Sequence, residues 1–311
     1  MDHQGSSITL RNRVGCWLWV LSALLPHIEW CSGDYRRIYL YHVRKTAGTS
    51  IAFALMRLAR TDPHLVDRRL ARFCFAQSHG YRYVANNATL IRQGSYFFAF
   101  SHLPAYTIEP PEVGTFKFTV LRDPIERVVS LYRYLASPEA DSSYSHKAPV
   151  EERRWATEGF DRFLEQIPRQ HLTNQLHMFS KSSGVDEAVN CLNQLDLVLR
   201  TEHLDRDLGR LQEALGLRFS LTRERSSLLP FTPTDGQRNR LYDVLKPEFE
   251  ILRQIQPGWR LDSPLSGQIP KQGAILYAHG GDSTMDPACR VLRSGASHSA
   301  KPEISLFREI N

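Results

Sequence analysis

Cysteines are few in this chain and form no recognisable pattern. Five occur among 311 residues, widely spaced and never as a CxxC pair. A disulfide-stapled domain needs paired cysteines and a zinc–thiolate site needs short spacings between them, so neither class is indicated. We expect no metal site, because no cluster of other metal-ligating residue types stands out along the chain.

Long apolar runs are also missing. The apolar run near the N-terminus covers only residues 14–25 and is followed by Pro26. A membrane-spanning helix needs about 20 such residues, whereas the core of a signal peptide needs roughly 7–15. Two interpretations of residues 1–35 stay open. They are a poorly packed N-terminal extension of a cytoplasmic protein, which we favour, or a signal-like segment that would place the protein at a membrane or in a Golgi-type lumen.

Charge of one sign is only slightly in excess. Lysine and arginine total 39 against 33 acidic residues, which gives a net charge of +6. This balance suits an anionic ligand, but the acidic residues are too many for a basic arm that binds nucleic acid. Hydrophobic residues make up 42% of the chain and charged residues 23%, an ordinary globular composition that excludes a disordered, collagen-like or polytopic membrane protein.

Short apolar runs alternate with amphipathic segments, and this alternation predicts an α/β fold. Four runs are expected to be strands: 38–43, 97–100, 116–121 and 195–199. Strands that alternate with helices form mostly parallel sheets covered by helices on both faces. We expect one domain over residues 36–262, mainly helical in its second half, followed by a loosely ordered tail rich in Gly, Ser and Pro over residues 263–311.

Polar residues directly follow three of the expected strands. The pairs are Arg44-Lys45, Ser101-His102 and Arg122-Asp123. Ligands of parallel α/β sheets bind beyond the carboxyl ends of the strands. We therefore expect the three pairs to gather at one edge of the sheet, where the chemistry takes place.

The first of these segments has the composition of an anion-binding loop. Its sequence is Lys45-Thr46-Ala47-Gly48-Thr49-Ser50. The lysine supplies a cation, the glycine lets the backbone approach a ligand, and the following helix presents N–H groups at its N-terminus. A Walker A loop is excluded, because that motif requires glycines ahead of the lysine. The shorter loop suits one terminal phosphate-like group; the alternative is an ordinary polar turn with a helix cap.

A second polar segment leaves the same edge and begins a helix. Asp123 is expected to cap this helix, with Pro124 at its first position and Glu126 at the third position of a capping box. Arg122 offers a planar fork suited to phosphate, and Ser130 offers a hydroxyl about two turns into the helix. The alternatives are an ion pair of Arg122 with a neighbouring carboxylate and a surface serine without a ligand.

Together, the two segments resemble a known pair of motifs. A KTAGTS-type loop followed by LRDPxxRxxSxY resembles the two nucleotide-binding motifs of the sulfotransferases, and most closely those of the branch that includes the heparan-sulfate 2-O- and 6-O-sulfotransferases and bacterial relatives. Further likenesses are Asn174-Gln175, residues 197–216 and residues 248–252. The resemblance covers residues 36–260. It implies a sheet like that of the phosphate-loop NTPases, flanked by helices.

The resemblance also implies the roles of individual residues. The loop from Lys45 to Ser50, with Arg44 at its mouth, would grip the 5′-phosphosulfate of 3′-phosphoadenosine 5′-phosphosulfate (PAPS). Arg122 and Ser130 would hold its 3′-phosphate. One departure is Arg44 itself, because the family usually has proline before the lysine, and the change adds a positive charge at the mouth of the loop.

Sulfuryl transfer requires in-line positioning, neutralisation of the leaving oxygen and a base for the attacking hydroxyl. Lys45 is the candidate to neutralise the bridging oxygen. His102 is the candidate base, because it follows a strand at the expected edge and resembles the catalytic histidine of the family. His42 is its main rival, and Glu109 and Glu112 are weaker candidates on a proline-containing segment. The chemistry requires no metal.

The sequence therefore predicts a PAPS-dependent enzyme that moves a sulfuryl group to a hydroxyl, expected to belong to a carbohydrate. Its partners would be the nucleotide donor and a hydroxylated acceptor, with no nucleic acid, and membrane contact could come only through the N-terminal segment. Two alternatives stay open: another phosphate-loop enzyme such as a nucleotide kinase, and a non-catalytic protein that binds anionic glycans. The missing Walker glycines disfavour the kinase.

Overall fold

The computed structural model describes residues 3–22, 28, 30–137, 149–222 and 229–255. The expected C-terminal tail over residues 263–311 lies outside the described residues. The division of the chain at residues 35/36 and 262/263 stays a prediction.

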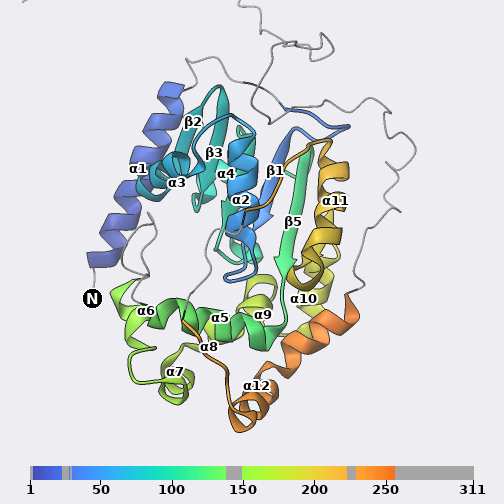
Figure 1. The fold of residues 1–311 in the computed structure, drawn as a ribbon. Coiled ribbons are helices and arrows are strands. Elements are labelled where there is room, and N and C mark those ends of the chain that lie inside the picture. The colour runs from blue at the N-terminus through green and yellow to red at the C-terminus, as the bar shows by residue number, and fades with distance from the viewer. Residues whose placement is uncertain (1–2, 23–27, 29, 138–148, 223–228, 256–311) are drawn as a thin grey trace, which may run out of the picture.

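One six-stranded sheet forms the centre of the molecule (Figure 1). Its order is β2-β3-β4-β1-β5-β6, and all neighbouring strands are parallel except the antiparallel pair of β2 and β3. The strands are β1 (Arg37–Tyr41), β2 (Phe75–Ser78), β3 (Tyr81–Ala85), β4 (Phe98–Ser101), β5 (Thr115–Leu121) and β6 (Leu197–Arg200). The predicted α/β fold class and its mostly parallel sheet are confirmed.

The hairpin of β2 and β3 was not expected from the sequence. Its two-residue turn consists of His79 and Gly80, with φ angles of 46° and 83°. Two consecutive positive φ angles are typical of the tight turns whose twist matches that of a hairpin. The dipeptides that signal such a turn most strongly are Asn-Gly, Asp-Gly and Gly-Gly, so His-Gly is a weak turn signal in the sequence.

Both faces of the sheet are covered, because successive side chains of each central strand point to opposite sides. In β1, Ile38 and Leu40 join one core cluster, while Tyr39 and Tyr41 join the other. The first cluster is covered by α2 (Gly48–Arg57), α3 (Pro63–Phe73) and α11 (Leu204–Leu215). The second is covered by α4 (Ala88–Gln93), α9 (Asn174–Phe179) and α10 (Val185–Leu192).

A separate helical layer lies beyond the carboxyl ends of the strands, below the tip of β5 in Figure 1. It contains α5 (Pro124–Ala136), α6 (Val150–Arg154), α7 (Phe160–Gln166), α8 (Arg169–Leu172) and α12 (Asp235–Gln254). Side chains of α5, α7 and α12 form a third apolar cluster, which includes Val128, Phe163 and Leu245. This layer and the sheet edge enclose the space in which the predicted site residues lie.

The N-terminal helix α1 (His3–Ser22) runs alongside α3 and β2 (Figure 1). Its contact with the domain is close: a Cβ on Gly15 would lie 2.1 Å from the Phe73 carbonyl oxygen, and Arg82 Nη2 donates to the Ser22 carbonyl oxygen at 2.9 Å. This packing differs from the poor packing expected of an extension. Among the described helices, none is both long and apolar enough to cross a membrane. The location of the protein in the cell stays a prediction.

The contribution of the N-terminal region to stability can be tested with two tryptophans. Trp30 is only 5% exposed and meets Phe97 edge to face, with 6.0 Å between ring centroids, whereas Trp17 on α1 is 70% exposed. We expect Trp30→Ala to lower the free energy of unfolding by about 3–5 kcal/mol, because it empties a core site. Trp17→Ala, the matched control, should change it by less than about 0.5 kcal/mol in the same urea titration. Equal effects of the two substitutions would contradict this packing.

Candidate functional site

A cleft of about 1220 Å³ opens at the carboxyl edge of the sheet. The segments that follow β1, β4, β5 and β6 all reach it, because parallel strands end at the same edge. Every residue predicted for the site lines this cleft except Thr46: the others are Arg44, Lys45, Ala47, Gly48, Thr49, Ser50, His102, Arg122 and Ser130. The structure therefore brings together predicted site residues that lie up to 86 positions apart in the chain, from Arg44 to Ser130.

The loop between β1 and α2 is held in an uncommon backbone conformation. Lys45 and Ala47 have φ angles of 67° and 69°, in the left-handed region that non-glycine residues rarely adopt. Inside the loop, the Thr46 side chain is buried and its hydroxyl donates to the Val43 carbonyl oxygen at 2.9 Å. Thr46 can therefore reach a ligand only through its backbone, while its side chain fixes the turn.

Gly48 is required for a reason that the sequence did not reveal. A Cβ at this position would lie 2.2 Å from Cδ2 and 2.5 Å from Nε2 of His42. No real Cβ tolerates such contacts, so the His42 ring can lie beneath the first turn of α2 only because residue 48 is glycine. Gly48, Thr49 and Ser50, which form the first turn of α2, line the cleft at this point.

The Arg122 side chain connects the second segment to the loop. Its Nη1 donates to the Lys45 carbonyl oxygen at 3.2 Å. Burial lowers the pKa of the Arg122 guanidinium, whereas the nearby Glu126 and Glu202 carboxylates raise it. An arginine stays charged under such conditions, and an anion bound beside it would offset the cost of its desolvation.

The cap of α5 is formed partly as expected. Asp123 accepts a hydrogen bond from the backbone N–H of Glu126 at 2.9 Å, and Pro124 begins the helix. The Glu126 carboxylate, however, accepts from Arg238 Nη2 at 3.1 Å, and it is Glu202 that accepts from the Asp123 backbone N–H, at 2.6 Å. The expected capping box is thus replaced by a contact from residues just after β6. Ser130 lies farther along α5 and lines the cleft.

A hydrogen bond orients the ring of His102 at the cleft. Its Nδ1 lies 2.8 Å from the carbonyl oxygen of His42, and its backbone N–H donates to Asn86 Oδ1 at 2.9 Å. A carbonyl oxygen can only accept, so Nδ1 carries the proton and Nε2 keeps its lone pair. The residue is exposed at the cleft. This is the tautomer that a general base requires.

The rival bases lie in less suitable places. His42 is buried, with its ring 4.2 Å from that of His102 between centroids and under Gly48. Glu112 accepts from Lys117 Nζ at 2.9 Å, and neither Glu112 nor Glu109 is among the described residues that line the cleft.

Two adjacent side chains of α9 hold both ligand-facing segments in place. Asn174 Oδ1 accepts from the Arg44 backbone N–H at 3.1 Å. Gln175 Oε1 accepts from the Arg122 backbone N–H at 2.7 Å, and Gln175 Nε2 donates to the Arg122 carbonyl oxygen at 3.0 Å. Thr201 adds a third tie, since its hydroxyl lies 3.2 Å from the carbonyl oxygens of both Thr46 and Leu121. Sequence reasoning missed these positioning roles, because each partner lies far away in the chain.

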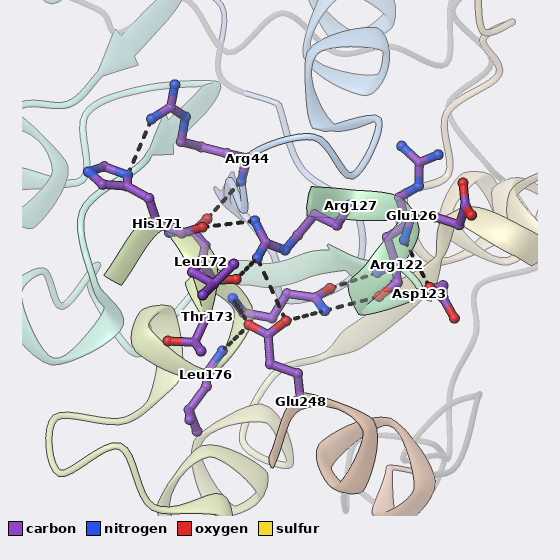
Figure 2. A network of polar contacts seen from close by, with 12 residues as sticks. Arg44, Arg122, Asp123, Glu126, Arg127, His171, Leu172, Thr173, Leu176 and Glu248 are labelled. Atoms are coloured by element: carbon purple, nitrogen blue, oxygen red, sulfur yellow. Dashed lines mark hydrogen bonds and ion pairs between the residues drawn. The ribbon is translucent and has the colours of Figure 1, made fainter. Parts of the chain in front are cut away.

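A buried ion pair supports α9 from below (Figure 2). Glu248 Oε1 accepts from the backbone N–H groups of Gln175 and Leu176, at 2.7 and 3.1 Å. Its Oε2 lies 3.8 Å from Arg127 Nη2, and both side chains are fully buried. Arg127 also donates to the carbonyl oxygens of His171 and Leu172. One carboxylate of α12 thereby links α5 to the start of α9.

The buried pair predicts a large loss of stability when its acid is removed. Glu248→Gln should lower the free energy of unfolding by about 3–5 kcal/mol, because it leaves the Arg127 charge buried without a counter-charge. Glu250→Gln is the matched control, since Glu250 is two residues away on α12 and pairs with Arg253 at the surface. In urea unfolding, the control should show no measurable change. A small effect of Glu248→Gln would mean that the pair does not anchor α9.

Comparison with known proteins agrees with this architecture. Residues 30–253 match the model of the Sulfotransferase family, which is well over half of the chain. No curated protein matches the chain significantly. The matched residues include β1 to β6 and every residue of the cleft discussed above, and the chain therefore belongs to the sulfotransferase family, whose general activity is the transfer of a sulfuryl group.

Proposed function

We propose that the protein transfers the sulfuryl group of PAPS to a hydroxyl group of a carbohydrate. The observation that carries the proposal is the hydrogen bond between the Arg122 guanidinium and the Lys45 carbonyl oxygen. It joins the two segments that resemble the nucleotide-binding motifs, and both line a single cleft. A nucleotide with a phosphosulfate at one position and a phosphate at another would contact both.

In this proposal the donor binds through backbone and side chains of both segments. The 5′-phosphosulfate accepts hydrogen bonds from the N–H groups of the loop and of the first turn of α2, and from the hydroxyls of Thr49 and Ser50. The 3′-phosphate accepts hydrogen bonds from the Arg122 guanidinium and the Ser130 hydroxyl. The polar groups of the cleft already fix the loop, so little ordering accompanies binding.

The proposed transfer step uses one residue at the attacking oxygen and another at the leaving oxygen. The acceptor hydroxyl loses its proton to Nε2 of His102, while its oxygen forms a bond to sulfur. The bond between sulfur and the bridging phosphate oxygen breaks, and Lys45 neutralises the charge that develops on that oxygen. Lys45 Nζ lies 4.3 Å from the ring centroid of Tyr134 on α5, at the cleft. The products are a sulfated acceptor and adenosine 3′,5′-bisphosphate.

The carbohydrate acceptor is proposed from the resemblance to carbohydrate sulfotransferases rather than from any bound group. Histidine, asparagine and glutamine side chains that line the cleft support it, because such groups bind sugar hydroxyls. They include Asn86, Gln170, Asn174 and His177.

Nucleotide selectivity tests the donor assignment. Adenosine 3′,5′-bisphosphate at about 100 times its dissociation constant should stabilise the protein by roughly 2.7 kcal/mol. AMP should bind more weakly, because it lacks the phosphate assigned to Arg122 and Ser130. Arg122→Ala should remove most of this difference, by about 1.5–3 kcal/mol in calorimetric titrations, whereas Arg162→Ala on the exposed face of α7 should not. Equal affinity of the wild-type protein for the two nucleotides would refute the assignment. A non-catalytic glycan-binding protein would bind neither.

Three variants separate binding from chemistry. His102→Ala should lower the single-turnover rate of sulfate transfer by about 100- to 10,000-fold, the usual contribution of a general base, and leave affinity for adenosine 3′,5′-bisphosphate nearly unchanged. Lys45→Ala should lower both quantities, because its charge also contacts the bound donor. His79→Ala, at the turn between β2 and β3, is the control and should change neither. Normal turnover of His102→Ala beside a defective His42→Ala would show that the base is His42.

A further inference from the structure

His42 directly follows β1, and both of its backbone polar groups bond to residues at the end of β4. Its N–H donates to the Ser101 carbonyl oxygen at 2.9 Å, and its carbonyl oxygen accepts from Nδ1 of His102 at 2.8 Å. The first bond continues the parallel pairing of β1 with β4 beyond Tyr41. The second determines which nitrogen of His102 carries the proton, because a carbonyl oxygen can only accept.

The imidazole ring of His42 also packs against the ring of His102. The two centroids are 4.2 Å apart and the ring planes are tilted by 32°. Phe100 completes the group, since its ring meets His42 at 5.7 Å and His102 at 6.4 Å between centroids, with interplanar angles of 70° and 80°. His42 is buried, whereas His102 is exposed at the cleft. The ring of the candidate base is therefore packed against a side chain that the protein interior holds in place.

The first turn of α2 limits the position of the His42 ring. A Cβ on Gly48 would lie 2.2 Å from Cδ2, 2.5 Å from Nε2 and 3.1 Å from Cγ of His42, and these are the three heavy atoms nearest to it. The ring thus fills the space that a side chain at residue 48 would need. Gly48 belongs to the loop assigned to the 5′-phosphosulfate, so one ring contacts both the proposed donor loop and the candidate base.

The backbone of His102 is fixed by a further residue of the cleft. Its N–H donates to Asn86 Oδ1 at 2.9 Å, and the Asn86 N–H donates to the Phe100 carbonyl oxygen at 3.1 Å. Asn86 has a φ angle of 52°, in the left-handed region that asparagine enters more readily than most residues. These bonds hold the backbone and one ring nitrogen of His102, and the contact with the His42 ring holds the face of its ring.

We propose that His42 is a positioning residue: its ring, which contacts both Gly48 and His102, keeps the ring of the base in one orientation and at a set distance from the donor loop. The inference rests on the proposed function, since it takes His102 as the base and residues 45–50 as the donor loop. In-line transfer needs the base, the attacking oxygen and the sulfur to be aligned, and a displacement of about 1 Å can cost about 100-fold in rate. His42 itself moves no proton.

The first test reads the tautomer of His102 by nitrogen NMR of histidine-labelled protein, at a pH at which the ring is neutral. The signals of His102 are identified by their loss in His102→Ala. The wild-type protein should carry the proton on Nδ1. His42→Ala keeps the carbonyl oxygen but removes the ring, so His102 should exchange between both tautomers. Gly48→Ala should have the same effect, because its Cβ displaces the His42 ring. His79→Ala, at the turn between β2 and β3, is the control and should leave the signals unchanged.

The second test is a double-mutant cycle on sulfuryl transfer. Single-turnover rates are measured with radiolabelled PAPS and with a mixture of neutral and sulfated oligosaccharides as the acceptor probe. His42→Ala alone should lower the rate about 10- to 100-fold, because it misplaces the base. In the His102→Ala background the same substitution should change the rate by less than about twofold, because no base is left to misplace.

Two results would overturn the inference: a tautomer of His102 that both His42→Ala and Gly48→Ala leave unchanged, or equal losses of rate from His42→Ala in the two backgrounds, which would show that His42 acts independently of His102. Thermal unfolding of each variant confirms that the fold is retained, and Gly48→Ala alone decides the NMR test if His42→Ala does not fold. Failure of the proposed function is seen separately, as a lack of binding of adenosine 3′,5′-bisphosphate to the wild-type protein, since the tautomer is measured without nucleotide or acceptor.

Discussion

The site depends on two neighbouring amide side chains that tie separate loops to one helix. Asn174 and Gln175 hold the backbones of Arg44 and Arg122, which follow different strands, and the Glu248 carboxylate in turn holds the start of α9. Amide side chains suit this task, because each presents both a donor and an acceptor without a charge that would compete for an anionic ligand. The backbones of both loops are thus fixed to the same helix, α9.

These hydrogen bonds explain how residues in strained backbone conformations and a partly buried charged side chain are maintained at the cleft. The left-handed backbone conformations of Lys45 and Ala47 and the half-buried charge of Arg122 each carry a cost in free energy. The hydrogen bonds from α9 and from Thr201 stabilise the loop in this conformation. A loop fixed before ligand arrives has less conformational entropy to lose on binding, which favours donor affinity and in-line geometry.

The sequence predicted those features that depend on neighbours in the chain. Strand patterns, the parallel sheet, the Asp123 cap and the convergence of polar segments at one edge all follow from local periodicity and from the geometry of parallel sheets. The sequence did not reveal contacts between distant residues: Glu202 in place of Glu126 at the cap, His42 as the reason for Gly48, and Glu152 as the partner of Arg44. Such pairs depend on how the helical layer packs against the sheet edge.

In the function that we propose, α9 holds the two segments in place as one nucleotide site before the donor binds. The most direct test is a crystal structure of the protein with adenosine 3′,5′-bisphosphate. We predict the 5′-phosphate within hydrogen-bonding distance of the loop from Lys45 to Ser50, the 3′-phosphate on Arg122, and the contacts of Asn174 and Gln175 unchanged. A nucleotide bound elsewhere, or a loop that leaves α9 in order to bind it, would contradict the claim.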